Sequence, residues 1–144
     1  MQWSLDSYEE LVYRIRDFSS HILFSTLVLQ RRGKLAGILK GKIVLTNDLT
    51  LTIHENLNFL FPEVRFIIDY AYEVKMGEAT QYWYDSQPHP NDPTLQSTHP
   101  HHKHIHPDIK HHRVPAPDLS FNEPNLPFLI QEIETLFFAQ NNDH

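Results

Sequence analysis

The sequence contains no cysteine, which excludes disulfide bridges, thiolate chemistry and cysteine-based zinc sites. It also has no apolar run that approaches the roughly 20 residues needed to cross a membrane. A general excess of positive charge is missing too, because the formal net charge is −6 at pH 7. These absences favour a soluble, cytoplasmic protein with no membrane partner, in which any binding of nucleic acid must be local.

The apolar content, by contrast, is sufficient for one hydrophobic core. The chain has 144 residues, of which 40% are hydrophobic, and this is the size and composition of one ordinary domain. The first residues, MQWSLDSYEEL, are acidic and amphipathic, whereas a signal peptide has a basic part followed by an apolar part. We therefore expect a single domain over residues 1–144.

Two helices are expected, one near each end of the chain. Residues from about 7 to 18 carry apolar side chains at helical spacing, and Ser7 with Glu10 forms the pattern of a capping box. Residues from about 126 to 139 keep the same spacing, and Pro127 suits the first turn of a helix. Both helices are therefore amphipathic and need an apolar surface to cover.

Runs rich in β-forming residues fill the region from about 21 to 85. Short turn sequences separate five such runs, which predict an antiparallel meander. Two helices on one face of this sheet give an α+β fold of two layers. The runs cover residues 22–30, 35–45, 49–59, 63–75 and 78–85.

Strand alternation assigns side chains to the faces of this sheet. It places Glu55 on the same face as Leu51, Ile53 and Leu57. A carboxylate on an apolar face is costly unless it is paired, so Glu55 is either a partnered structural acid or a site residue. In the fourth run, the residues expected to share one face are Val64, Phe66, Ile68, Tyr70, Tyr72 and Val74.

Histidine and proline dominate the segment from about 86 to 124. Most of the histidines of the chain lie between residues 89 and 112, and prolines at 88, 90, 93, 100 and 107 interrupt any continuous helix or central strand. We expect a long, irregular but stiffened loop. Imidazole changes its charge near neutral pH, transfers protons and binds metals, so this loop is the expected place for chemistry.

A metal site is the first chemistry that such a tract suggests. A closed zinc site needs about four ligands, which histidines and nearby carboxylates can supply. Lys103, however, stands in the middle of the run His101–His104, and its ammonium group would repel a divalent ion. We therefore expect no cofactor and no dedicated metal site, only adventitious binding of zinc or nickel.

Cleavage of RNA by acid–base chemistry is the second kind of chemistry that this histidine-rich segment suggests. Attack by the 2′-hydroxyl needs a base, an acid for the leaving 5′-oxygen and a cation near the phosphate. The run from His101 to His104 offers these groups without a metal, and Tyr82 or Tyr84 can stack on a base or bind a phosphate. Alternation along an extended segment places His102 and His104 on one side and His101 and Lys103 on the other. For any single histidine, a solvated surface loop is the alternative.

Three motifs follow one another in the second half of the chain: Tyr70-Ala71-Tyr72, then YDSQPHP at 84–90, then PHHKH at 100–104. This order resembles the TumE-type toxins of prokaryotic toxin–antitoxin pairs, and the similarity in order and spacing extends over about residues 5–138. Ser86 and Gln87 depart from the family pattern, which has Asn-Ala there. A single His89 also stands where the family usually has a histidine pair.

The resemblance implies a toxin that a cognate antitoxin holds in check, and RNA is the expected substrate. We therefore expect a metal-independent endoribonuclease in which His102 and His104 transfer protons, His101 or Lys103 stabilises phosphate charge, and Glu55 or Asp85 orients an imidazole. The alternatives are a non-enzymatic protein- or metal-binding module and a degenerate toxin that only binds its antitoxin; a homodimer formed through the edge strands stays open. The candidate catalytic residues are His89, His101, His102, Lys103, His104, Glu55 and Asp85, and the candidate substrate-binding residues are Tyr70, Tyr72, Tyr82 and Tyr84.

Overall fold

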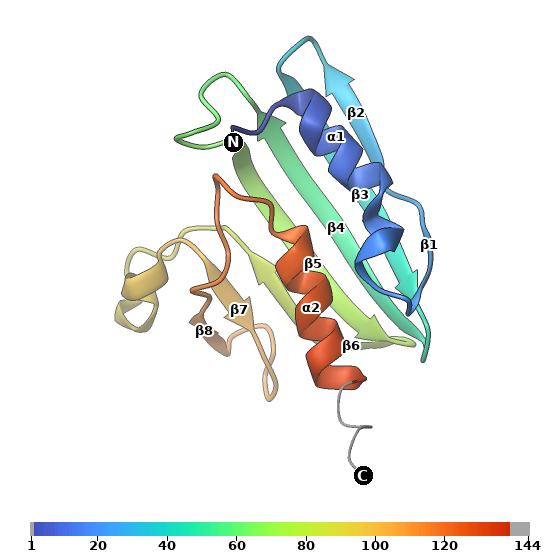
Figure 1. The fold of residues 1–144 in the computed structure, drawn as a ribbon. Coiled ribbons are helices and arrows are strands. Elements are labelled where there is room, and N and C mark those ends of the chain that lie inside the picture. The colour runs from blue at the N-terminus through green and yellow to red at the C-terminus, as the bar shows by residue number, and fades with distance from the viewer. Residues whose placement is uncertain (1, 139–144) are drawn as a thin grey trace.

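The computed structural model describes residues 2–138 and shows an α+β fold (Figure 1). An antiparallel sheet carries one helix from each end of the chain on the same face, as expected (Figure 1). Within the described residues, no helix is long and apolar enough to span a membrane. Both α-helices of residues 2–138 lie on this face, and the opposite face of the sheet is termed the open face (Figure 1).

The N-terminal helix α1 runs from Leu5 to Tyr13 and is followed by a short 3-10 helix, η1, at Ile15–Phe18. Its N-cap is Ser4, whose side chain accepts a hydrogen bond from the backbone N–H of Ser7, while the Ser7 hydroxyl accepts one from the N–H of Ser4. The predicted capping box of Ser7 with Glu10 is therefore wrong. The helix begins earlier than predicted because a serine pair satisfies its first free N–H groups.

The C-terminal helix α2 spans Leu126–Phe137, with Pro127 in its first turn as predicted. Its buried face consists of Leu126, Leu129, Ile130 and Ile133. The predicted end at about 139 lies outside the described residues. Burial of this apolar stripe against the sheet fixes the position of α2.

The sheet has eight strands, so the predicted number of five is wrong. Its order is β1-β3-β4-β5-β6-β7-β8, and β2 also pairs with β3. The central strands β3 to β6 form the predicted meander. The strands are β1 Ile22–Ser25, β2 Val28–Arg32, β3 Ala36–Leu45, β4 Leu49–Asn58, β5 Ile67–Met76, β6 Ala79–Asp85, β7 His102–His104 and β8 Arg113–Pro115.

Two features account for the three additional strands. The first predicted run breaks between β1 and β2, at Thr26 and Leu27, where β3 carries Gly41 at a φ of 139°. A Cβ at Gly41 would lie 2.6 Å from the carbonyl oxygen of Thr26, so only glycine fits this close approach. The predicted loop also contains the 3-10 helix η2 at Pro93–Thr98 and supplies β7 and β8, which extend the sheet beyond β6.

The predicted assignment of side chains to the two faces of the sheet is correct for β4 and only partly correct for β5. Glu55 is fully buried on the helix-covered face of β4, together with its apolar neighbours at alternate positions. Phe66, Tyr70, Tyr72 and Val74 are buried as predicted, but Val64 and Ile68 are exposed. The β4–β5 register shifts between Asn56 and Leu57, and this irregularity turns Ile67, rather than Ile68, into the core.

Candidate functional site on the open face of the sheet

The pairing of β6 with β7 decides which side chains meet. Asp85 lies opposite His102, Tyr84 opposite Lys103 and Trp83 opposite His104. Asp85, His102 and His104 therefore point to the open face, and Lys103 points to the face that carries the helices. The expected separation of Lys103 from the two histidines is thus seen in the structure.

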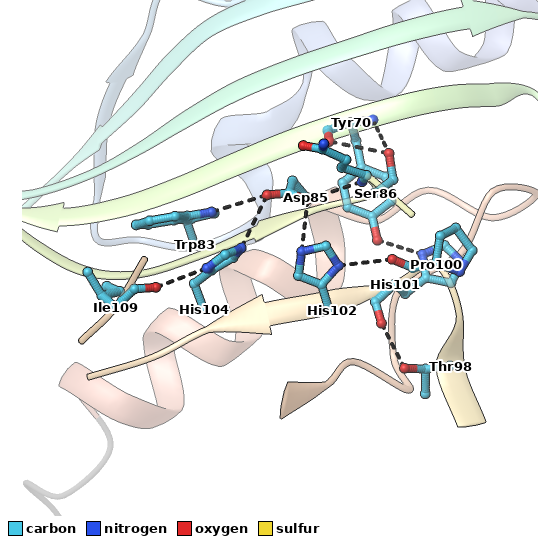
Figure 2. A network of polar contacts seen from close by, with 11 residues as sticks. Tyr70, Trp83, Asp85, Ser86, Thr98, Pro100, His101, His102, His104 and Ile109 are labelled. Carbon is cyan, nitrogen blue, oxygen red and sulfur yellow. Dashed lines mark hydrogen bonds and ion pairs between the residues drawn. The ribbon is translucent and has the colours of Figure 1, made fainter. Parts of the chain in front are cut away.

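Asp85 lies between two histidines (Figure 2). Its Oδ1 is 2.9 Å from Nε2 of His102, and its Oδ2 is 3.4 Å from Nε2 of His104. The indole N–H of Trp83 donates to Oδ2 at 3.2 Å, and the backbone N–H of Gln87 donates to Oδ1 at 3.1 Å. The carboxylate is therefore held in a fixed orientation by its own strand and the residues that follow it.

Backbone carbonyl oxygens fix the two imidazole rings from behind. Nδ1 of His102 lies 3.0 Å from the carbonyl oxygen of Pro100, and Nδ1 of His104 lies 2.9 Å from that of Ile109 (Figure 2). A carbonyl oxygen only accepts, so each Nδ1 carries a hydrogen. In both neutral rings the lone pair is then on Nε2, which faces Asp85.

The cluster is largely buried, which shapes its electrostatics. His102 and His104 are 1% and 5% exposed, whereas the side chain of Asp85 retains 24%. Burial acts to raise the pKa of Asp85, but the neighbouring His102 outweighs it and lowers that pKa to about 2. Burial also lowers the pKa of His104. Solvent thus reaches the cluster mainly at the carboxylate.

Two shallow hollows flank the cluster on the open face. One has a volume of about 370 Å³ and is lined by residues of β4 to β6 that include His54, Trp83 and Asp85. The other is lined by His89 and Arg113 together with the Pro88–Pro93 turn. The ring of His89 packs edge-on against that of His102, with centroids 4.8 Å apart. Burial and the charge of Arg113 lower the pKa of His89.

Arg113 is a member of this site that the sequence analysis missed. It pairs with His104 across β7 and β8, so its side chain lies on the same face as the cluster. The sequence could have indicated Arg113 only through the strand β8. This strand has three residues, which are too few for an alternating pattern to be recognised. Trp83, whose indole N–H donates to Asp85, is a second member that the sequence analysis missed.

His101 belongs to a neighbouring aromatic group rather than to the Asp85 cluster. Its Nδ1 lies 2.5 Å from the hydroxyl of Tyr70, on which its ring stacks, and it also contacts Phe121. Burial, followed by the charge of Arg65, lowers the pKa of His101 to about 4. This imidazole is therefore neutral at pH 7.

Lys103 is tied to helix α2. Its Nζ lies 2.9 Å from Oε2 of Glu132 and 4.2 Å from the centre of the Tyr82 ring. The hydroxyl of Tyr84 donates to the same carboxylate at 2.8 Å. The structure therefore brings Lys103 together with Tyr82 and Tyr84, but on the opposite side of the sheet from His102.

Glu55 and the candidate tyrosines lie in the core. The hydroxyls of Tyr8 and Tyr72 each donate to Glu55 at 2.5 Å, which connects α1 to the sheet. Burial raises the pKa of Glu55 to about 7, although both hydrogen bonds act to lower it. The tyrosines at 70, 72, 82 and 84 are all at most 5% exposed. Of the two expected roles of Glu55, its hydrogen bonds to Tyr8 and Tyr72 match that of a partnered structural acid.

The departures from the family pattern at Ser86 and Gln87 leave the cluster intact. The hydroxyl of Ser86 accepts a hydrogen bond from the backbone N–H of Tyr70 at 3.0 Å and so continues the β5–β6 contact. Gln87 supports Asp85 through its backbone N–H, which any residue except proline provides. Neither departure removes a contact of Asp85.

Comparison with known proteins gives one family. The family model described as Toxin TumE matches residues 11–137, which is most of the chain. No curated protein and no solved structure shows a significant match. The match confirms the resemblance that the three sequence motifs indicated.

Proposed function

Since the chain belongs to the Toxin TumE family, we propose that it is the toxin component of a toxin–antitoxin pair and that it cleaves RNA by acid–base chemistry. The observation that supports this proposal best is the group of imidazoles around Asp85 on the open face of the sheet. The expected partner is a cognate antitoxin.

The open face offers the three kinds of group that RNA cleavage needs. His89 is the imidazole with direct access to solvent, and Arg113 beside it can balance the charge of a phosphate. The cluster of Asp85 with His102 and His104 is the second carrier of a proton. Trp83, which lines the hollow over β4 to β6, provides an aromatic surface on which a base can stack.

The roles of Lys103 and Glu55 in this proposal differ from those expected. Lys103 is held by Glu132, and Glu55 is enclosed by tyrosines. Both residues stabilise the sheet that presents the site, so they act through the fold. Arg113 takes over the role of the cation.

Growth arrest in cells that express the chain tests the proposal. We expect arrest with the unchanged protein and loss of arrest with His89→Ala, because general acid–base groups contribute about 100-fold or more to a rate. His111→Ala is the matched control, since His111 is an exposed histidine of the same segment whose Nδ1 lies 3.1 Å from a carboxylate oxygen of Asp108. Equal toxicity of His89→Ala and the control would contradict the assignment of His89.

A non-enzymatic binding module is the alternative that the histidine cluster also favours. It predicts no RNA cleavage by the purified protein under any ionic condition. Binding of the antitoxin without cleavage would correspond to the degenerate toxin.

A further inference from the structure

Three side chains on the open face direct one ligand atom each towards a common point. The atoms belong to Asp85, His102 and His104 and lie within 4.8 Å of one another. We infer that these residues form a binding site for a single divalent metal ion of the zinc class. This inference goes beyond RNA cleavage and does not depend on it.

The arrangement of donors and acceptors in the cluster calls for a cation. Both Nδ1 atoms donate to backbone carbonyls, so in the neutral rings both Nε2 atoms present lone pairs to a carboxylate that is also an acceptor. Nε2 of His102 is buried and has no hydrogen bond of suitable direction within residues 2–138. Buried acceptors without donors are costly. A proton on Nε2 of His102 pairs that ring with one oxygen of Asp85 and leaves His104 without such a partner, whereas a metal ion would serve all three ligands.

The distances suit such an ion. Zinc binds imidazole nitrogen and carboxylate oxygen at about 2.0–2.2 Å, which places tetrahedral ligand atoms about 3.3 Å apart. Asp85 lies 2.9 Å from His102 and 3.4 Å from His104. These distances join Oδ1 to His102 and Oδ2 to His104, and the three ligand atoms lie within 4.8 Å of one another. Rotation of the side chains would bring them to the positions of zinc ligands.

The surroundings of the three ligands are those of a prepared metal site. Histidines that bind metals donate their other ring N–H to a carbonyl or carboxylate, which fixes the ring. The carbonyl oxygens of Pro100 and Ile109 do this here. The N–H groups of Trp83 and Gln87 orient the carboxylate. Imidazole with a carboxylate is a ligand set typical of zinc and similar ions.

The sequence-based objection to a metal site does not apply to this geometry. Lys103 was expected to repel an ion, but it lies on the other face and its charge is paired with Glu132. Asp85 is the most exposed of the three ligands, so the fourth position faces solvent. Three protein ligands and one water complete a tetrahedral zinc site.

Metal binding by the full chain tests this inference. The chain is stripped with a chelator and titrated with Zn²⁺ by calorimetry, and its melting temperature is measured with and without the ion. We expect one equivalent to bind and to raise the melting temperature, because a ligand of the folded state stabilises it. Asp85→Asn should lower the affinity by about 100-fold or more, since even loss of a supporting contact costs about 10–100-fold.

The control removes the exposed histidines of the same segment. The double variant His111→Ala and His112→Ala should bind Zn²⁺ as tightly as the unchanged chain. Equal affinity of the Asp85→Asn variant and the unchanged chain, or loss of the bound equivalent in the double variant, would show that only surface histidines bind and would overturn the inference. Circular dichroism without metal confirms that Asp85→Asn is folded. Co²⁺ absorption provides a second readout of the ligand geometry that is independent of RNA cleavage.

Discussion

Glu55 is the residue whose environment has the clearest consequence for stability. It is fully buried, and burial raises its pKa to about 7 from 4.5. In the unfolded chain the carboxyl group loses its proton above about pH 4.5, while the folded chain keeps it until about pH 7. The unfolded state therefore binds fewer protons in this window, and the stability of the folded protein falls as the pH rises through it.

We expect Glu55 to cost the protein ~3 kcal/mol of unfolding free energy between pH 4.5 and pH 7, with no further loss above the folded-state pKa. Urea denaturation over a pH series measures this. In Glu55→Gln, an uncharged side chain of the same shape occupies the site between Tyr8 and Tyr72, and the loss should disappear. All other groups titrate alike in the unchanged protein and in Glu55→Gln. If the unfolding free energy of both proteins depends on pH in the same way, Glu55 does not hold a proton in the core.

Gly41 governs the sheet at the scale of its elements. It stands opposite the break between β1 and β2, and its φ of 139° and the short distance to Thr26 exclude a Cβ. Gly33 has a φ of 80° but no other heavy atom within 4 Å of a built Cβ. The two glycines therefore separate the cost of backbone conformation from the cost of a clash.

We expect Gly41→Ala to destabilise the protein by about 2 kcal/mol more than Gly33→Ala, since it adds a clash to a conformation that already costs about 1 kcal/mol or more. Chemical denaturation of both variants measures the difference. Equal stabilities would mean that β1 and β2 can move away from β3 without cost, and that Gly41 does not determine the break.

The elements differ in how far the sequence predicted them. The helices and the strands β3 to β6 are long enough for apolar periodicity to reveal them. The strands β7 and β8 have three residues each and exist because β6 offers them an edge, which is a contact between distant parts of the chain. A sequence pattern carries no trace of such a contact.

In the candidate site, too, the sequence predicted what depends on local patterns and missed what depends on contacts between strands. Alternation along 101–104 correctly separated His102 and His104 from Lys103, because that rule is local. The roles of Arg113 and Trp83 were missed, since both depend on pairing between strands. The partnership of Glu55 with Tyr8 was equally hidden, because it joins α1 to β4.

For the whole molecule, RNA cleavage by acid–base chemistry and metal binding require different states of the Nε2 atoms of His102 and His104. An ion bound by Asp85, His102 and His104 would occupy both Nε2 atoms, and neither could then carry a proton. If the protein cleaves RNA by acid–base chemistry, the metal-bound form should be the slower one. The rest of the fold holds this face in place, with Glu55 fixing α1 and Glu132 fixing α2 and β7.

Cleavage of RNA by the purified chain in the presence of a chelator tests the central claim most directly. Attack by the internal 2′-hydroxyl should leave 2′,3′-cyclic phosphate and 5′-hydroxyl ends. We expect these ends with the unchanged protein and with His111→Ala, a strong loss of rate with His89→Ala, and slower cleavage when one equivalent of Zn²⁺ replaces the chelator. Absence of cleavage in the chelator, with or without cleavage in Zn²⁺, would contradict metal-independent acid–base chemistry at this site.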